Sequence, residues 1–232
     1  DGQIVANDPR YQGVLTKRAV AGMPLSLSCD AAASSRRRTT TTTYLSSKIV
    51  GLEMHVATAR QQPGFLFTVA SSVSSADIDS ATLNLYVNQF GSETYDSLKY
   101  KVFEHSGTAW TNTNGNRPYD RYDASGATEY TISPDLTSPA SREWPIPISS
   151  AAIKAAIDGN VDHGKAGTVL EISLLPSTTV IDGLQLQGVG SANPPTLEIA
   201  GAATYNQSEP LVKKPAGTET PMEPAVGGDA VA

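Results

Sequence analysis

The chain has 232 residues and a formal net charge of −6, with 17 Lys and Arg against 23 Asp and Glu. A chain of this length suits one β-sandwich domain with additional arms. The acidic balance argues against a nucleic-acid-binding protein, which needs a basic surface to neutralise phosphates. The one basic run, Arg36-Arg37-Arg38, is interpreted as a solvated loop or as a contact for an anion or a partner.

The single cysteine, Cys29, excludes a disulfide framework within the chain. It ends the alternating segment Leu25-Ser26-Leu27-Ser28-Cys29, so we expect a small buried side chain in or beside a strand. No stretch approaches the roughly 18 apolar residues of a membrane span, so no membrane partner is expected. The chain opens on Asp1, which leaves open a removed signal peptide, a removed propiece or an unnumbered Met.

Residues 1–43 lack a clear hydrophobic period and are predicted to form an N-terminal arm or linker. Short strands are expected only at Val14-Leu15 and at 25–29. Residues 30–43, with the sequence DAAASSRRRTTTTT, are polar and of low complexity. This composition favours a loop or linker between the arm and the rest of the chain.

Alternating apolar and polar residues predict a β-sandwich over residues 44–203. The clearest alternation runs over 78–87, where a change of phase at Ser80-Ala81 indicates a bulge or the start of a second strand. Gln61-Gln62-Pro63-Gly64 is predicted to be a turn. Pro145 and Pro147 place the strand at 144–148 on a sheet edge, because proline cannot donate to a ladder. The other expected strands are 52–56, 65–69, 98–103, 129–132, 168–175, 183–186 and 196–199.

The one predicted helix covers residues 149–158. Ser149 or Ser150 can cap its start, and Gly159 can end it. Ile153 and Ile157 are four residues apart and are expected to face the core together.

Residues 204–232 are predicted to form a Pro-rich C-terminal arm. Four prolines and few large apolar side chains leave this segment little surface to bury. Burial within the segment alone cannot offset an ordering entropy of about 1–2 kcal/mol per residue. We therefore expect the arm to bind a partner surface, or to be a linker to a neighbouring domain.

Four segments carry a resemblance to a known family. They are Thr43-Tyr44-Leu45-Ser46-Ser47, the strand pair at 65–69 and 78–87, the helix-containing block at 148–172, and Asn193–Ile199. In order and spacing they resemble the DNRLRE, or disaggregatase-related, family of jelly-roll carbohydrate-binding modules. The resemblance covers about residues 43–200. It implies a jelly-roll-like antiparallel β-sandwich with one short helix. Together with the two predicted arms, the expected fold is all-β, a jelly-roll-like antiparallel β-sandwich with one short helix and extended N- and C-terminal arms.

The chain departs from the family pattern in three places. Ala155-Ala156-Ile157 stands where the family usually shows a Trp, and Phe67 stands where it usually shows an Arg. The family's middle segment has only a loose counterpart at 109–118. These differences bear more on sugar binding than on the fold, because a fold does not fix a function.

Residues 106–126 are rich in Gly, Asn, Asp, Tyr and Trp and are predicted to be a long surface loop. Sugar-binding modules stack the apolar face of a sugar on exposed aromatic rings and select hydroxyls with polar groups. In the alternative interpretation, Trp110 folds back and covers an open end of the sandwich. The candidate carbohydrate or partner contacts are Trp110, Asn112, Asn114, Arg117, Tyr119 and Tyr122.

Asp158-Gly159-Asn160-Val161-Asp162 is similar to the first half of a calcium loop. His163 and Val169 stand where such a loop needs Gly and an acidic ligand, so a helix C-terminal turn is favoured. We expect no metal site and no cofactor, with structural calcium as the minor alternative. No hydrolase elbow, zinc-binding pair, P-loop or dinucleotide fingerprint is present. The chain is therefore predicted not to be an enzyme, although paired carboxylates of the glycosidase kind stay open.

Two functions follow from these features. The first is a structural or adhesive protein of the virion surface, of the phage capsid decoration, cement or fibre-base type. Its arms would bind capsid or other virion proteins, and it would form a homo-oligomer, a trimer or dimer. The alternative is a carbohydrate-binding module of a secreted or cell-surface bacterial protein, with glycans as partners.

Overall fold

The computed structural model describes residues 3–5, 14–16, 24–38, 41–46, 49–55, 59–89, 97–106, 110–111, 116–132, 142–176 and 181–201. The chain divides into two units, Val20–Thr204, and Asp1–Ala19 together with Tyr205–Ala232. In the second unit, β1 (Gln3–Val5) pairs antiparallel with β2 (Val14–Thr16), and Ile4 lies opposite Leu15. The predicted C-terminal arm from residue 204 lies outside the described residues.

The unit Val20–Thr204 is an antiparallel β-sandwich with few helices, as the sequence predicted. Its strands are β3 (Leu25–Ser28), β4 (Ala31–Arg38), β5 (Thr41–Ser46), β6 (Ile49–His55), β7 (Ala59–Val69), β8 (Ser80–Gln89), β9 (Leu98–Glu104), β10 (Tyr130–Ile132), β11 (Arg142–Ile148), β12 (Thr168–Pro176), β13 (Ile181–Gln187) and β14 (Thr196–Ala200). Its helices are α1 (Pro118–Ala124), α2 (Ser150–Gly159) and α3 (His163–Ala166), with a short 3-10 turn at Ser75–Asp77.

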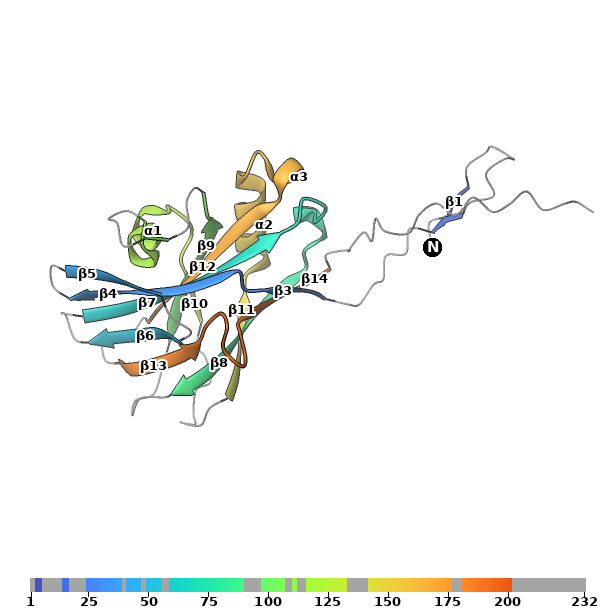
Figure 1. The fold of residues 1–232 in the computed structure, drawn as a ribbon. Coiled ribbons are helices and arrows are strands. Elements are labelled where there is room, and N and C mark those ends of the chain that lie inside the picture. The colour runs from blue at the N-terminus through green and yellow to red at the C-terminus, as the bar shows by residue number, and fades with distance from the viewer. Residues whose placement is uncertain are drawn as a thin grey trace, which may run out of the picture. The chain divides into compact units, whose positions relative to one another are not determined.

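The strands pair in the order β10-β9-β12-β7-β6-β13-β8-β14-β3, with β11 on β8, β4 on β7 and β5 on β4 (Figure 1). The main core takes side chains from β7, β9 and β12 and from β8, β11, β13 and β14. Since β6 separates these two groups in the strand order and their side chains share one core, we infer that the groups pack face to face. Phe65, Phe67, Leu83, Leu170 and Ile199 are fully buried there.

Strand β8 shows why the alternation at 78–87 was informative. Ala81, Leu83, Leu85 and Val87 are buried, and the residues between them are partly exposed, as the two-residue period of a strand requires. The strand begins at Ser80, directly after the 3-10 turn, and this explains the change of phase in the sequence.

Two further elements agree with the prediction. β11 pairs only with β8 among the described strands, so its two prolines lie on an edge strand. Helix α2 buries Ile153 and Ile157 together with Ala152 and Ala156, and packs beside β9 and β12. It ends at Gly159, and Asn160 follows as its C-cap.

The predicted loop over residues 30–43 is wrong. β4 pairs with β7 over eight residues and with β5 over six, so the sandwich begins well before residue 44. Ala33 and Ser35 are fully buried. Small side chains are suited to this position because Trp110 packs on Ala33 and Tyr119 N is hydrogen-bonded to Ser35.

The predicted turn at Gln61–Gly64 is also wrong, because these residues continue β7. Pro63 lies in the gap between the β6 ladder, which ends at Gln61, and the β12 ladder, which begins at Gly64. A missing N–H there interrupts neither ladder. A Cβ on Gly64 would lie 2.8 Å from Trp110 Cζ2, so this glycine permits close packing and does not form a turn.

Candidate functional site beneath helix α1

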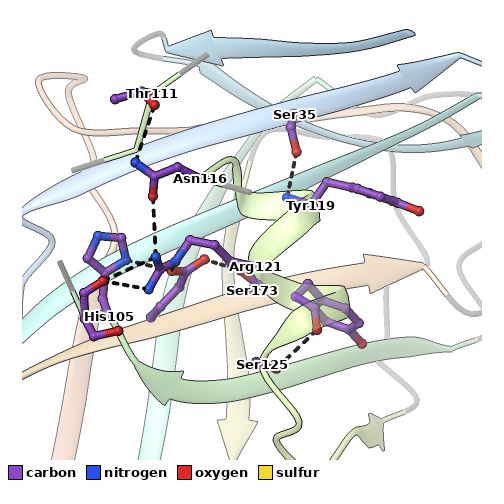
Figure 2. Close-up of polar contacts among 11 residues, drawn as sticks. Ser35, His105, Thr111, Asn116, Tyr119, Arg121, Ser125 and Ser173 are labelled. Carbon is purple, nitrogen blue, oxygen red and sulfur yellow. Dashed lines mark hydrogen bonds and ion pairs between the residues drawn. The ribbon is translucent and has the colours of Figure 1, made fainter. Parts of the chain in front are cut away.

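Helix α1 occupies part of the segment 106–126 that was predicted to be a long surface loop (Figure 1). Pro118 at the first helical position favours the start of a helix, because proline lacks the N–H that would be unsatisfied there. Arg117 at the N-cap makes no side-chain cap hydrogen bond. Instead Tyr119 N donates to Ser35 Oγ of β4 at 2.8 Å, so the sheet supplies the cap (Figure 2).

The aromatic side chains of this segment are buried, in contrast to the expected exposed platform. Trp110 is 7% exposed, Tyr119 is 6% exposed and Tyr122 is 2% exposed. Trp110 packs with Ala33 and Leu66 in a small second core on the outer face of the sheet. The rings therefore cover the sheet and do not offer open faces for stacking. Trp110 folds back as in the alternative interpretation, but it covers a face of the sheet and not an open end of the sandwich.

A fully buried carboxylate, Glu171 of β12, lies beneath α1. It accepts hydrogen bonds from His105 Nδ1 at 2.7 Å, Arg121 Nε at 2.9 Å and Ser173 Oγ at 3.1 Å. Because a carboxylate only accepts hydrogen bonds, His105 carries a hydrogen on Nδ1. The negative charge of Glu171 is thus paired with the positive charge of Arg121 inside the protein.

Arg121 also fixes the segments that flank Trp110. Its guanidinium donates to Ser106 O and Asn116 Oδ1, each at 3.4 Å (Figure 2). The edge of the His105 ring meets Trp110, with 5.6 Å between the ring centroids. One charged side chain therefore holds β12, the end of β9 and the entry to α1 together.

Most buried polar side chains of the described residues gather in this layer. Ser34 and Thr168 lie elsewhere. Ser34 Oγ accepts a hydrogen bond from Gln61, and Thr168 Oγ1 is hydrogen-bonded to Asn160 and His163. We call the remaining six the polar layer: Ser35, Gln62, His105, Arg117, Glu171 and Ser173. Apart from Arg117, which begins α1, they come from β4, β7, β12 and the end of β9.

Gln62 and Trp110 have unmatched hydrogen-bonding groups. No described residue lies within hydrogen-bond distance of Gln62 Nε2, Gln62 Oε1 or Trp110 Nε1. Gln62 is fully buried, and it lies opposite Ser35 in the β4–β7 ladder. Unmatched polar atoms in a protein interior are costly and uncommon.

Beside the polar layer, α1 is attached to β9 by Lys101. Its ammonium donates to Tyr122 O at 2.8 Å and lies 4.7 Å from the centroid of the Tyr122 ring. Tyr122 Oη donates to Glu129, which also pairs with Lys99 at 2.7 Å. The hydrogen bond from Lys99 lowers the pKa of Glu129 below its ordinary value, and the bond from Tyr122 acts in the same direction.

Other reactive side chains are used in structural contacts. Burial raises the pKa of the Cys29 thiol to about 12, and its Sγ donates to Ala31 O. His163 uses Nε2 on Val73 O and Nδ1 on Thr168 Oγ1, each at 2.8 Å. Since a carbonyl oxygen only accepts hydrogen bonds, the His163 hydrogen lies on Nε2.

The segment similar to half a calcium loop is a helix C-terminal turn. Asn160 Nδ2 donates to Gly167 O and Thr168 Oγ1, and Asn160 Oδ1 accepts from Asp162 N. Across the residues that the structure describes, no group of three or more His, Cys, Asp or Glu side chains is placed to bind a metal ion. Within the same residues, no helix has the length and apolar character needed to cross a bilayer.

The six candidate contact residues are thus divided by the structure. Trp110, Arg117, Tyr119 and Tyr122 lie together in or beside the polar layer. Asn112 and Asn114 lie outside the described residues. The residues on either side of them are joined, since Thr111 N donates to Asn116 O at 3.1 Å.

Sequence reasoning missed the centre of the site, Glu171, and its neighbours Gln62 and Ser35. One signal was present for Glu171, a single charged residue within the apolar run Val169-Leu170-Glu171-Ile172. A continuous apolar run is typical of a strand that is buried on both faces. An acidic residue within such a strand is expected to be buried and therefore to be paired with a positive charge.

No protein-family model matches the chain, and no curated protein matches it.

Proposed function

We propose that the chain is a non-catalytic structural protein of the virion-surface type, in which the sandwich is a rigid scaffold and the arms bind neighbouring subunits. The observation that carries the proposal is how the reactive side chains of the described sandwich are used. Glu171, His105, His163 and Cys29 are all held in structural contacts. Side chains that are held in buried hydrogen bonds and ion pairs favour a single rigid structure.

The role of the arms rests on their composition. Residues 204–232 contain Pro210, Pro215, Pro221 and Pro224 and few large apolar side chains. Such a segment gains order by binding to another surface, and it can wrap a large area of that surface. The expected partners are capsid or other virion proteins and further copies of this chain.

Trypsin protection tests this proposal. The bonds after Lys17 and Arg18 report on the N-terminal arm, and the bond after Lys213 reports on the C-terminal arm. We expect rapid cleavage of the free chain at these bonds, and cleavage at least tenfold slower on particles or oligomers that contain it. Mass spectrometry identifies each cut. Equal cleavage rates in the free and assembled states would reject arm binding.

The second candidate, a carbohydrate-binding module, is favoured by the family resemblance and by one local feature. Thr111 N donates to Asn116 O, so the two described residues on either side of 112–115 are hydrogen-bonded to each other. Trp110 is buried against the sheet, and Arg121 donates to Asn116 Oδ1. The amides of Asn112 and Asn114 are groups of the kind that bind sugar hydroxyls.

A glycan array with purified protein tests this alternative. Asn112→Ala combined with Asn114→Ala should abolish binding, and an unchanged melting temperature would show that the loss is a loss of binding and not of folding. Asn193→Ala, an exposed asparagine on the turn before β14, is the matched control. The absence of binding to any neutral or acidic glycan would reject this alternative. Trp110→Ala is unsuitable because that ring is part of the packing.

A further inference from the structure

The fully buried amide of Gln62 needs a partner that the described residues do not supply. Its Oε1 is an acceptor and its Nε2 a donor, and a side chain in water would use both. Gln62 is 0% exposed and lies opposite Ser35 in the β4–β7 ladder, one residue past the end of the β6 ladder at Gln61.

A second unmatched group lies on the same patch of the sheet. Residues two apart in a strand point to the same face, about 7 Å apart, so Gln62 and Gly64 share the outer face of β7. The Trp110 ring lies against Gly64, where a Cβ would be only 2.8 Å from Cζ2. The indole Nε1 is also without a partner among the described residues. The two unmatched groups therefore belong to side chains at neighbouring positions on the outer face of β7.

The chemistry of these groups selects the ligand. An anion cannot donate to Gln62 Oε1, and a cation cannot accept from Gln62 Nε2 or Trp110 Nε1. The charge of Glu171 in the polar layer is already paired with that of Arg121, and the charge of Arg117 with that of Asp120. A hydroxyl group both donates and accepts, and so matches the set.

We propose that the polar layer encloses a binding site for a hydroxyl-bearing molecule, between the Gln62 amide and the Trp110 indole, with α1 as its cover. The occupant is either ordered water or a small polyol such as a sugar. This inference goes beyond the proposed function, because a scaffold of either class can contain such a site.

The sign of a stability change tests whether the site is filled. Gln62→Met keeps the size and shape of the side chain and removes its hydrogen bonds. If the amide is bonded to an occupant, the variant loses that bond, and the melting temperature should fall by roughly 3–8 °C. If the amide is unmatched, removing it relieves a penalty, and the melting temperature should stay the same or rise. The second result overturns the proposal.

Gln61→Met is the matched control, because the Gln61 amide has a visible partner, Ser34 Oγ at 2.9 Å. Its melting temperature should fall by an amount similar to that of Gln62→Met. A high-resolution crystal structure of the full chain should show density for the occupant beside Gln62 and Trp110. A dry site in that density also overturns the proposal.

Titration with glycerol, glucose and galactose separates the two kinds of occupant. Excluded solutes stabilise any folded protein, so the Gln62→Met variant supplies the baseline. A saturable rise in melting temperature in the wild type only identifies a polyol site. Equal rises in both proteins, together with density at Gln62, identify ordered water as the occupant.

Discussion

Glu171 is fully buried and accepts hydrogen bonds from three side chains, one of them the charged Arg121. Glu171→Gln removes the negative charge and leaves the guanidinium in a partly buried position without its counter-charge. Removing one partner of a buried pair costs about 3–5 kcal/mol. We expect a loss of this size in the free energy of unfolding, measured by urea denaturation.

The control for this substitution is Asp162→Asn, which breaks an exposed pair with Lys165. Exposed pairs contribute little, so that variant should stay within about 0.5 kcal/mol of the wild type. Equal effects of the two substitutions would show that the charge of Glu171 has no role in holding α1.

The Cys29 thiol gives the protein a dependence on alkaline pH. Burial raises its pKa from 9.0 to about 12, so the folded protein holds this proton more tightly than the unfolded chain does. Stability from this group is complete below pH 9 and is lost as the pH rises from 9 toward 12. Between pH 7 and pH 10 the wild type should lose roughly 1 kcal/mol more than Cys29→Ala.

Urea denaturation of both proteins at the two pH values measures this difference. The subtraction removes the effect of Tyr100, whose pKa is also raised by burial. Parallel losses in the two proteins would mean that Cys29 is accessible to solvent in the folded state.

At the level of the element, α1 depends on β4 for its cap. Ser35 Oγ accepts from Tyr119 N, and the N-cap residue Arg117 makes no side-chain cap bond. Ser35→Ala should therefore cost about 1–2 kcal/mol, as the loss of an N-cap does. Hydrogen exchange should increase most at the amides of α1. Ser149→Ala is the matched control, because Ser149 is the N-cap of α2 but makes no side-chain cap bond. Equal effects would refute the cap from β4.

Elements with one buried face and a clear period could be predicted from the sequence. β8 buries every second residue, α2 buries Ile153 and Ile157, and the prolines of β11 marked an edge. β4 could not be predicted, because the Ala and Ser residues that suit close packing resemble those of a linker. α1 could not be predicted because its cap is Ser35, which lies 84 positions from Tyr119 in the sequence.

The sequence analysis expected the aromatic rings of the segment 106–126 to be exposed, and the described rings are buried. The sequence pointed to the segment of Trp110, Tyr119 and Tyr122, and the structure brings these residues together. Whether aromatic rings stack outward or pack inward depends on what lies beneath them. Here that surface is built by Glu171 and Ser35, which lie 50 and 84 residues from their α1 partners. Patterns within one segment cannot report such contacts.

At the scale of the whole molecule, we expect the two units to have different roles, one in stability and the other in assembly. The main core, the polar layer and all three helices lie within Val20–Thr204. A two-stranded ladder such as β1–β2 is marginally stable by itself, so it adds little to the stability of the sandwich. A chain of residues 20–204 should therefore melt within about 2 °C of the full chain, since a change of under 1 kcal/mol shifts a domain of this size by no more than a few degrees.

The same truncation, which should hardly change stability, should have a large effect on assembly. If the arms bind neighbouring subunits, the 20–204 chain stays monomeric under conditions where the full chain forms oligomers or binds particles. Light scattering after size-exclusion chromatography measures the mass of each. Chains lacking only residues 1–19 or only residues 205–232 show which arm is needed. A 20–204 chain that assembles as well as the full chain would place the subunit contacts on the sandwich itself, and the arms would then be linkers, as the carbohydrate-binding alternative requires.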